Sequence, residues 1–406
     1  MRSDLACHLA NRLGRLESKK VKKVRKFGWH EISTASRSGE FTMEKTRLLV
    51  RLVAFAWFRY VIIFCFALDF GSRLNAEPPP TKASVAQSEE IKGWPAEVRA
   101  IEYPSNADGT NQPALFYDPG GDAPKPLLVA LHSWSGDYRQ ANPAYAQWCI
   151  AKGWVLIHPD FRGVNQRPEA CGSELVVKDI LSAVAFAKRT YKIDPSRIYL
   201  IGASGGGFAS LLLAGRAPEL WAGVSAWCPI YDLKAWHAET KTRKLRYADM
   251  LEAVCGGPPG SSPIVDEEYR RRSAKAFLAQ AAGKVNLAIN TGITDGHQGS
   301  VPVGHALRAF NAVADESDRL SEDDIAAFES SPDLAAPWRQ SIKDPTFGKK
   351  RPLFRRVSNS AQVTIFQGGH EIVFPAGLAW LEQQRKGKPP VWKFDPPAPI
   401  ELTEQP

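Results

Sequence analysis

Residues 197–215 read RIYLIGASGGGFASLLLAG. An apolar run leads into a Gly-x-Ser-x-Gly turn centred on Ser204, and a helical pattern of small and apolar residues follows at once. A strand, a tight turn and a helix form the context in which such a turn presents a nucleophilic serine. Side chains at Gly202 and Gly206 would collide across the bend, which explains why both positions are glycine. The segment therefore predicts a parallel α/β unit with Ser204 at its sheet edge.

The rest of the chain alternates between strand-like and helical segments. Eight strands are predicted, at 97–104, 113–119, 126–132, 153–160, 197–202, 221–227, 285–292 and 361–367. Several of them are near-continuous apolar runs, which are typical of strands covered on both faces. Helical periodicity marks 173–190, 206–215, 303–314 and 374–386. The order predicts an α/β fold with a mostly parallel eight-stranded sheet and helices on both faces. A short loop between the first two strands predicts a hairpin.

Composition shifts divide the chain into predicted parts. The charged and apolar shares, 23% and 44%, are those of a packed globular protein. We expect, in chain order, a basic leader with a signal peptide (1–76), a Pro-rich linker (77–94), a catalytic domain (95–386) and a C-terminal tail (387–406). Two inserts, 229–284 and 315–360, interrupt the domain, and long inserts in such folds are usually functional loops.

The formal charge of +9 is concentrated near the N-terminus. Residues 1–76 contain 15 Lys and Arg against 6 Asp and Glu, whereas residues 77–406 contain 37 of each. Nucleic-acid binding through phosphates needs clustered cations, and the sequence after residue 76 contains no such stripe. We therefore expect no nucleic-acid partner.

The basic leader contains a signal-peptide pattern. After Met43 come a positively charged region, an apolar stretch at 61–68 and a small-residue cleavage site ending at Ala76. Met43 is interpreted as the true start, and the mature protein as secreted or periplasmic, with no stable membrane partner. The alternative is an uncleaved membrane anchor, although Arg51 and Arg59 interrupt the apolar run that spanning would need.

Four cysteines follow the leader in a context of export, where disulfides persist. Cys171 and Cys255 stand in Gly-flanked loops and are the preferred pair, while Cys149 and Cys228 lie in apolar segments that suit buried thiols. Three pairings are open to four cysteines, and the spacings match no zinc site.

A serine nucleophile needs a base and an acid that orients it. His370, in FQGGHE after the last predicted strand, is the candidate base, and Asp295, in TDGHQGS after the seventh, is the candidate acid. Both stand where the carboxyl ends of the strands meet. Asp232 is the alternative acid and His297 the alternative base. No metal or cofactor is expected.

The oxyanion formed during acyl transfer needs backbone N–H donors. The residue after the nucleophile, Gly205, supplies one. The loop after the third predicted strand supplies the second, from Trp134 or Ser133, and Trp134 is the preferred donor.

These segments together resemble the α/β-hydrolase superfamily, especially prolyl-oligopeptidase-like catalytic domains and related secreted esterases. The resemblance rests on LLVALHSWSGDY (127–138), HPDFRGVN (158–165), YLIGASGGGFA (199–209), TGITDGHQGSVP (291–302) and FQGGHE (366–371). It implies structural roles for Asp160 and Arg162. The chain departs from the family at Ser133, where glycine is usual, and in the extra stretch between Asp295 and Val301-Pro302.

The resemblance implies a serine hydrolase, and an ester substrate is preferred over a peptide. Dedicated prolyl peptidases carry an N-terminal propeller, whereas about twenty residues separate the predicted cleavage site from the first predicted strand. The expected substrate is a carboxylic ester, for example an acylated carbohydrate or polymer, with Tyr231, Trp236 and Tyr247 shaping its pocket. The alternatives are a small serine peptidase and a non-catalytic binding module.

Overall fold

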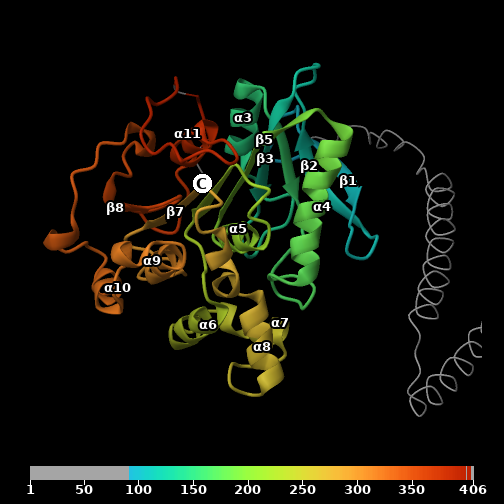
Figure 1. The fold of residues 1–406 in the computed structure, drawn as a ribbon. Helices are drawn as coiled ribbons and strands as arrows, with labels where there is room; N and C mark the ends of the chain where they lie inside the picture. The colour runs from blue at the N-terminus through green and yellow to red at the C-terminus, as the bar shows by residue number, and fades with distance from the viewer. Residues whose placement is uncertain (1–90, 399, 404–406) are drawn as a thin grey trace, which may run out of the picture. The chain divides into compact units, whose positions relative to one another are not determined.

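The structure, a computed structural model, describes residues 91–398 and 400–403. The predicted leader and most of the predicted linker lie outside these residues. Nine strands form one sheet in the described part: β1 (Arg99–Pro104), β2 (Asn111–Tyr117), β3 (Lys125–Leu131), β4 (Val155–Pro159), β5 (Ile193–Ala203), β6 (Gly223–Trp227), β7 (Leu287–Gly292), β8 (Pro352–Ser358) and β9 (Ala361–Phe366). Figure 1 shows this sheet crossing the molecule between layers of helices.

The sheet is parallel at its centre and antiparallel at both edges. Its strand order is β1-β2-β4-β3-β5-β6-β7-β9-β8. The chain winds outward in both directions from β3, which lies between β4 and β5. β1 and β2 form the predicted hairpin. The carboxyl ends of β3, β5, β6, β7 and β9 therefore meet at one edge, where α/β folds place their ligands.

The ninth strand corrects the sequence prediction. β8 pairs antiparallel with β9 at the end of the sheet, within the stretch that was predicted as an insert. Its sequence, PLFRRVS, begins with proline and carries Arg355 and Arg356, so it lacks a clean apolar alternation. Proline and charged side chains are typical of edge strands, where they discourage pairing with another chain.

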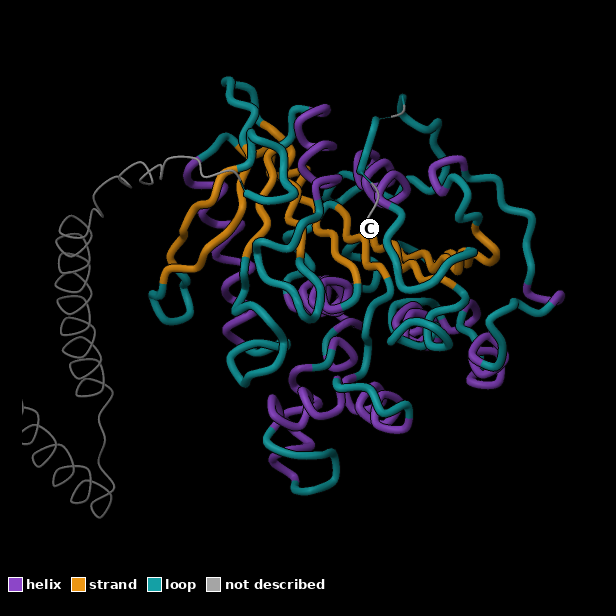
Figure 2. Tube along the Cα trace, turned by 180° about the vertical axis from the view of Figure 1, so that it is seen from behind, coloured by secondary structure: helices purple, strands orange, loops and turns teal. Residues whose placement is uncertain are grey.

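Helices cover both faces of the sheet, as predicted. Leu128 and Ala130 of β3 pack on the face covered by α3 (Pro143–Lys152) and α11 (Phe374–Gln383), while Leu127 and Val129 pack on the other. The second face carries α4 (Glu174–Thr190), α5 (Gly205–Arg216) and α9 (Gly304–Asn311). The view from behind in Figure 2 shows the strands as the layer between these helices.

The insert 229–284 folds into a helical unit. It contains α6 (Leu233–Thr242), α7 (Tyr247–Cys255), α8 (Pro263–Arg272) and two 3-10 turns, η1 (Ala274–Ala276) and η2 (Leu278–Ala281). Asp232 and Ser262 cap the first and third of the helices by accepting backbone N–H bonds. The unit shares one hydrophobic cluster with Trp134 and Phe208. It therefore packs directly against the loop after β3 and the first turn of α5.

The second insert, 315–360, is less regular. It contains η3 (Glu316–Asp318), α10 (Glu322–Glu329), η4 (Ala336–Trp338), η5 (Pro345–Phe347) and β8. A capping box at Ser321 and Asp324 starts α10. Phe328 of α10, Trp338 of η4 and Phe354 of β8 contact one another, which anchors the insert to the sheet.

The described part of the tail forms an extended strap without helix or strand. Trp392 stacks on Trp380 of α11 with ring centroids 5.5 Å apart, and Phe394 packs on the same hydrophobic cluster. Thr403 exchanges hydrogen bonds of 2.8 Å with the side chain of Gln147 in α3. The strap thus crosses the face formed by α3 and α11.

The preferred disulfide is not formed. Cys149, Cys171, Cys228 and Cys255 are all buried free thiols. Cys171 and Cys255 do share the hydrophobic cluster of the helical insert, where a thiol packs as a small apolar group. None of the helices within 91–398 combines the length and apolarity needed to cross a bilayer.

Candidate active site

Ser204 lies at the bend between β5 and α5, as the Gly-x-Ser-x-Gly motif predicts. Its φ and ψ are 57° and −118°, a conformation that residues other than glycine rarely adopt. Its N–H donates to the carbonyl oxygen of Trp227 in β6 at 2.9 Å. The neighbouring strand therefore fixes the strained backbone, and the side chain lies at the carboxyl edge of the sheet.

The glycines around the serine have the predicted steric origin. A Cβ atom on Gly202 would lie 2.5 Å from the carbonyl carbon of Gly206, and one on Gly206 would lie 2.5 Å from the carbonyl oxygen of Leu131. Both distances fall below any normal contact with backbone atoms. The bend therefore requires glycine at both positions.

His370 and Asp295 form a direct pair. The Nδ1 atom of His370 lies 2.7 Å from Oδ2 of Asp295, whose side chain is fully buried. The second carboxylate oxygen, Oδ1, accepts the N–H groups of Gly296 at 3.0 Å and Val301 at 3.1 Å. The loop after β7 thus fixes the carboxylate while Oδ2 faces the imidazole, the arrangement that fixes a histidine tautomer.

The pair alters the protonation of the histidine. Burial alone would lower the pKa of His370, but its hydrogen bond to the Asp295 carboxylate and the neighbouring Cys228 raise it above its ordinary value. Burial also raises the pKa of the Cys228 thiol, so the thiol is neutral near pH 7. The carboxylate of Asp295 is therefore the charge that stabilises a protonated His370.

The loop after β3 offers one free donor beside the serine. The N–H of Ser133 donates to Oε1 of Gln140 at 2.7 Å and is occupied. The Trp134 backbone nitrogen lies against Gly205, where an added Cβ atom would overlap it. Asn165 donates to the Trp134 carbonyl oxygen through its backbone at 3.0 Å. Gly205 begins α5, and the first N–H groups of a helix have no partner within it.

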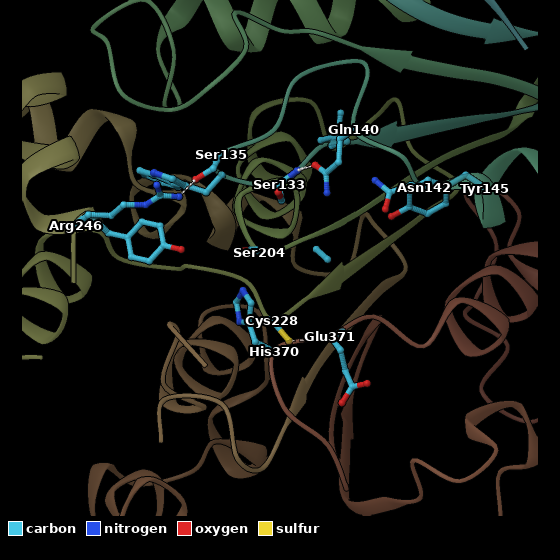
Figure 3. Close-up of a pocket in the computed structure, with 14 residues that line it drawn as sticks. Ser133, Ser135, Gln140, Asn142, Tyr145, Ser204, Cys228, Arg246, His370 and Glu371 are labelled. Carbon is cyan, nitrogen blue, oxygen red and sulfur yellow. Dashed lines mark hydrogen bonds between the residues drawn. The ribbon is translucent and has the colours of Figure 1, made fainter. Parts of the chain in front are cut away.

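A cavity of about 300 Å³ lies beside Ser204 and His370 (Figure 3). Its wall includes Ser204, His370 and Trp134 together with polar and aromatic side chains from three other segments. The complete lining is Leu131, Ser133, Trp134, Ser135, Gln140, Asn142, Tyr145, Ala203, Ser204, Cys228, Arg246, Tyr247, His370 and Glu371. A space of this size suits a small molecule or the end of a larger one.

The alternative acid and base lie elsewhere. Asp232 caps α6 and forms an ion pair of 2.7 Å with Lys275. His297 is exposed and lines a second cavity of about 230 Å³ together with Glu239, Pro302 and Glu329. The structure brings neither residue into the cavity of Ser204.

The two upstream histidines have structural environments. His132 stacks on Phe161 at a centroid distance of 3.9 Å, and its Nε2 atom lies 2.7 Å from the carbonyl oxygen of Asp160. Burial lowers the pKa of His158 to about 3, so its ring is neutral. Arg162 pairs with buried Asp179 at 2.5 Å, in keeping with the structural role that the resemblance implies.

Of the three aromatic residues expected in the pocket, the structure places one there. Tyr247 lines the cavity. Trp236 is buried behind it, with its ring 4.7 Å from that of Trp134 and its Nε1 donating to the carbonyl oxygen of Ser300 at 2.9 Å. Tyr231 packs into the main core instead. The prediction was wrong for Tyr231 and Trp236 because sequence position in an insert does not show which face a side chain takes.

Several groups near the pair carried no sequence signal. The α-carbon of Gly299 lies against both Asp295 and His370, where a Cβ atom would overlap the carboxylate. Arg243 donates to the Gly299 carbonyl oxygen at 2.6 Å. The Cys228 Sγ atom lies 3.4 Å from the carbonyl oxygen of Glu371. The fold alone brings these contacts together, from segments far apart in the sequence.

Cys228, Asp295 and His370 are also the group of possible metal ligands that the described residues contain. Their donor atoms all lie within 4.8 Å of one another. Asp295 and His370 already bond each other in this arrangement.

One protein-family model matches part of this chain. Residues 141–322 match the model of the prolyl oligopeptidase family, a span that includes Ser204 and Asp295. Residues 141–322 therefore correspond to a domain of the prolyl oligopeptidase family. This match and the sheet topology confirm the α/β-hydrolase fold predicted from the sequence. The family is one of serine hydrolases, with both peptidases and esterases among its members.

Two curated relatives match part of this chain. The chain is 29% identical over 161 residues to the quorum-quenching protein AidA of Acinetobacter baumannii, which covers 37% of this chain and 53% of the relative. It is also 29% identical over 140 residues to acylamino-acid-releasing enzyme 1 of Oryza sativa subsp. japonica, covering 31% of this chain and 18% of that enzyme. The matches thus span about half of the first and a fifth of the second.

Two solved structures are also similar to part of this chain. An acylaminoacyl peptidase of Pyrococcus horikoshii is 16% identical with a TM-score of 0.49, covering 74% of this chain and 43% of the peptidase. An acetyl xylan esterase from Paenibacillus sp. R4 is 18% identical with a TM-score of 0.44, covering 62% of this chain and 84% of the esterase.

Proposed function

We propose that this protein is a serine hydrolase that cleaves carboxylic esters through Ser204, His370 and Asp295. The observation that carries the proposal is the 2.7 Å bond between His370 and Asp295, with His370 and Ser204 lining one cavity. A buried carboxylate, an imidazole and a strained serine at the sheet edge provide an acid, a base and a nucleophile.

The first step forms an acyl-enzyme. The Oγ atom of Ser204 attacks the ester carbonyl carbon while Nε2 of His370 takes the hydroxyl proton. Asp295 stabilises the imidazolium through its bond to Nδ1. The carbonyl oxygen becomes an oxyanion that accepts hydrogen bonds from the N–H groups of Gly205 and Trp134. His370 then donates its proton to the departing alkoxide, and the alcohol leaves.

The second step releases the acid. A water molecule attacks the acyl carbon, His370 accepts its proton, and the same two N–H groups bind the second oxyanion. The proton then passes from His370 to Oγ of Ser204 as the acyl bond breaks. Neither step needs a group beyond this chain and water.

The volume of the cavity favours a substrate whose reacting end is small. Its volume of about 300 Å³ stands at the lower end of the range for small-molecule sites. An acetyl or other short ester on a carbohydrate or polymer fits that restriction, because only the ester need enter. We propose this class of substrate, and export of the protein after cleavage near Glu77, as extensions of the esterase proposal.

A peptidase is the second candidate. The relative named acylamino-acid-releasing enzyme 1 supports it, since that name describes amide cleavage. The same three residues serve either reaction, and amides differ by a poorer leaving group. Turnover of short nitrophenyl esters and of aminoacyl nitroanilides, measured on one preparation, separates the two.

The decisive test combines labelling and turnover. We expect a fluorophosphonate probe to label the wild-type protein and the Ser204→Ala variant to remain unlabelled and inactive. His370→Ala should likewise lose turnover. A protein that stays unlabelled while folded would instead be a binding module on a hydrolase scaffold. Labelling at another serine would contradict the assignment of Ser204.

A further inference from the structure

The charged side chains around the cavity are unevenly balanced. Besides His370, the lining contains Arg246 and Glu371 as its charged residues. Glu371 forms an ion pair of 2.8 Å with Lys350 and also accepts the N–H of Gly369 at 3.0 Å. Asp295 is fully buried behind His370 and bonded to it. The negative charges near the cavity are therefore already neutralised.

Arg246 has no such partner. Its guanidinium donates to Oγ of Ser135 at 3.0 Å and lies over the ring of Tyr247, 5.8 Å from the centroid. Both contacts are to uncharged groups. Within the part of the chain that the structure describes, Arg246 forms no ion pair with a carboxylate. The cavity consequently carries one unpaired positive charge on its wall.

Three other arginines of the same insert are paired with carboxylates. Arg270, Arg271 and Arg272 of α8 form ion pairs with Glu267 or Glu268 at 2.6 to 2.8 Å. Among the described residues, Arg243 of the same insert also has no carboxylate partner, but it donates to the carbonyl oxygen of Gly299 at 2.6 Å and does not line the cavity. Arg246 is the arginine of the insert that lines the cavity, and this position suits a binding role.

Arg246 and Glu371 lie on different sides of Ser204 in the cavity. Figure 3 shows Arg246 beside Ser135 on one side of Ser204 and Glu371 on another. A guanidinium pairs with a planar carboxylate through two parallel N–H bonds. Tyr247 and Ser135 hold the guanidinium from two directions, which reduces the conformational freedom lost on binding.

We propose that Arg246 selects substrates that carry a carboxylate in addition to the ester that is cleaved. The inference rests on the proposed esterase function and specifies its substrate class. A carboxylate on the acyl or the alcohol part of the substrate approaches the Arg246 side of the cavity while the ester carbonyl lies at Ser204.

The test compares charged and neutral esters of the same shape. On the acyl side, the probes are mono-nitrophenyl esters of adipic, pimelic and suberic acid, with the corresponding methyl-ended diesters as neutral controls. On the alcohol side, 4-acetoxybenzoate is compared with 4-acetoxybenzamide. We expect the wild-type protein to prefer the charged member of at least one pair in kcat/KM.

Substitution of the arginine then identifies the cause. Arg246→Gln should lower kcat/KM for the preferred charged ester about tenfold, a modest effect because the side chain is exposed and solvent screens its charge. Turnover of the neutral partner should change less than about twofold. Arg246→Glu should lower kcat/KM for the charged ester further than Arg246→Gln does. Arg270→Gln, on an exposed and paired arginine of the same insert, is the matched control and should change neither.

Three results would overturn the inference. One is the absence of a charged-ester preference in the wild-type protein. Another is equal loss on both members of a pair in Arg246→Gln, which would show a structural role through the Ser135 loop; Ser135→Ala checks that loop independently. The third is no ester turnover at all. That result refutes the proposed esterase function first, whereas normal neutral-ester turnover with a failed preference refutes only the role of Arg246.

Discussion

The α-carbon of Gly299 packs against the carboxylate of Asp295, so closely that an added Cβ atom would overlap Oδ1 and come within 2.7 Å of Cβ of His370. The loop that carries Gly299 also supplies the Val301 N–H that holds Oδ1 at 3.1 Å. A single backbone position therefore controls how the candidate acid faces its base.

Gly299→Ala should reduce kcat/KM about a hundredfold, because the methyl group displaces the carboxylate and a small misplacement of catalytic groups is costly. Steady-state kinetics and a thermal melt check this together. In an Asp295→Asn background the same substitution should add little, since the two changes act on one unit. Full additivity of the two losses would show that Gly299 acts elsewhere.

The pH profile should follow His370. The base must be neutral to accept the serine proton, and the Asp295 carboxylate raises the pKa of His370 above 6.5 despite the opposing effect of burial. Activity should therefore rise with pH and reach half its plateau above pH 6.5. Asp295→Asn removes the charge that stabilises the cation, so the midpoint should move to lower pH. A profile of kcat/KM against pH measures both.

The plateau rate of Asp295→Asn should fall about a thousandfold or more, the order of loss seen when the orienting acid of a triad is neutralised. Asp232→Asn is the matched control for the alternative acid. Asparagine caps a helix as well as aspartate, so this variant loses only the ion pair with the exposed Lys275 and should lose less than about 1 kcal/mol of stability while turnover persists. The opposite outcome, with Asp232→Asn inactive and Asp295→Asn active, would reverse the assignment.

The backbone strain at Ser204 should have a measurable effect on the free energy of unfolding. Its φ of 57° and ψ of −118° suit glycine better than any other residue. Ser204→Gly should be more stable than Ser204→Ala by about 1 kcal/mol, since relief of strain exceeds the added entropy of the unfolded chain. Urea denaturation of the two inactive variants makes the comparison. Equal stability would mean that the bend is not strained in solution.

The C-terminal strap should contribute to stability and not to turnover. Trp392→Ala removes the stacking on Trp380 and should reduce the free energy of unfolding by about 1 to 2 kcal/mol. Lys393→Ala, at an exposed position next to it, should have almost no effect. Denaturant titration gives the stabilities, and an unchanged kcat/KM separates this role from one at the active site.

The features that were predicted correctly depend either on one contiguous stretch of sequence or on the order of the strands. β5, the bend at Ser204 and α5 are contiguous, so one stretch of residues carries the apolar run, the glycines and the helical pattern together. His370 and Asp295 were placed by strand order, because residues that follow parallel strands share one sheet edge. Chain order and local pattern were sufficient for both.

The features that escaped prediction depend on contacts between distant segments. α6, α7 and α8 are short, and their packing against Trp134 and Phe208 has no periodic trace in the sequence. The proximity of Cys171 and Cys255 was expected, but burial of both thiols among apolar side chains replaces the bond. Arg246 is one of many arginines until the fold places it on the cavity wall.

The helical insert both lines the cavity and holds the loop after Asp295, through Trp236 to Ser300 and Arg243 to Gly299. The insert therefore couples the shape of the cavity to the position of the candidate acid. Under the proposed function, a new substrate preference is reached most readily by changes at Arg246 or Tyr247 that leave Trp236 and Arg243 in place.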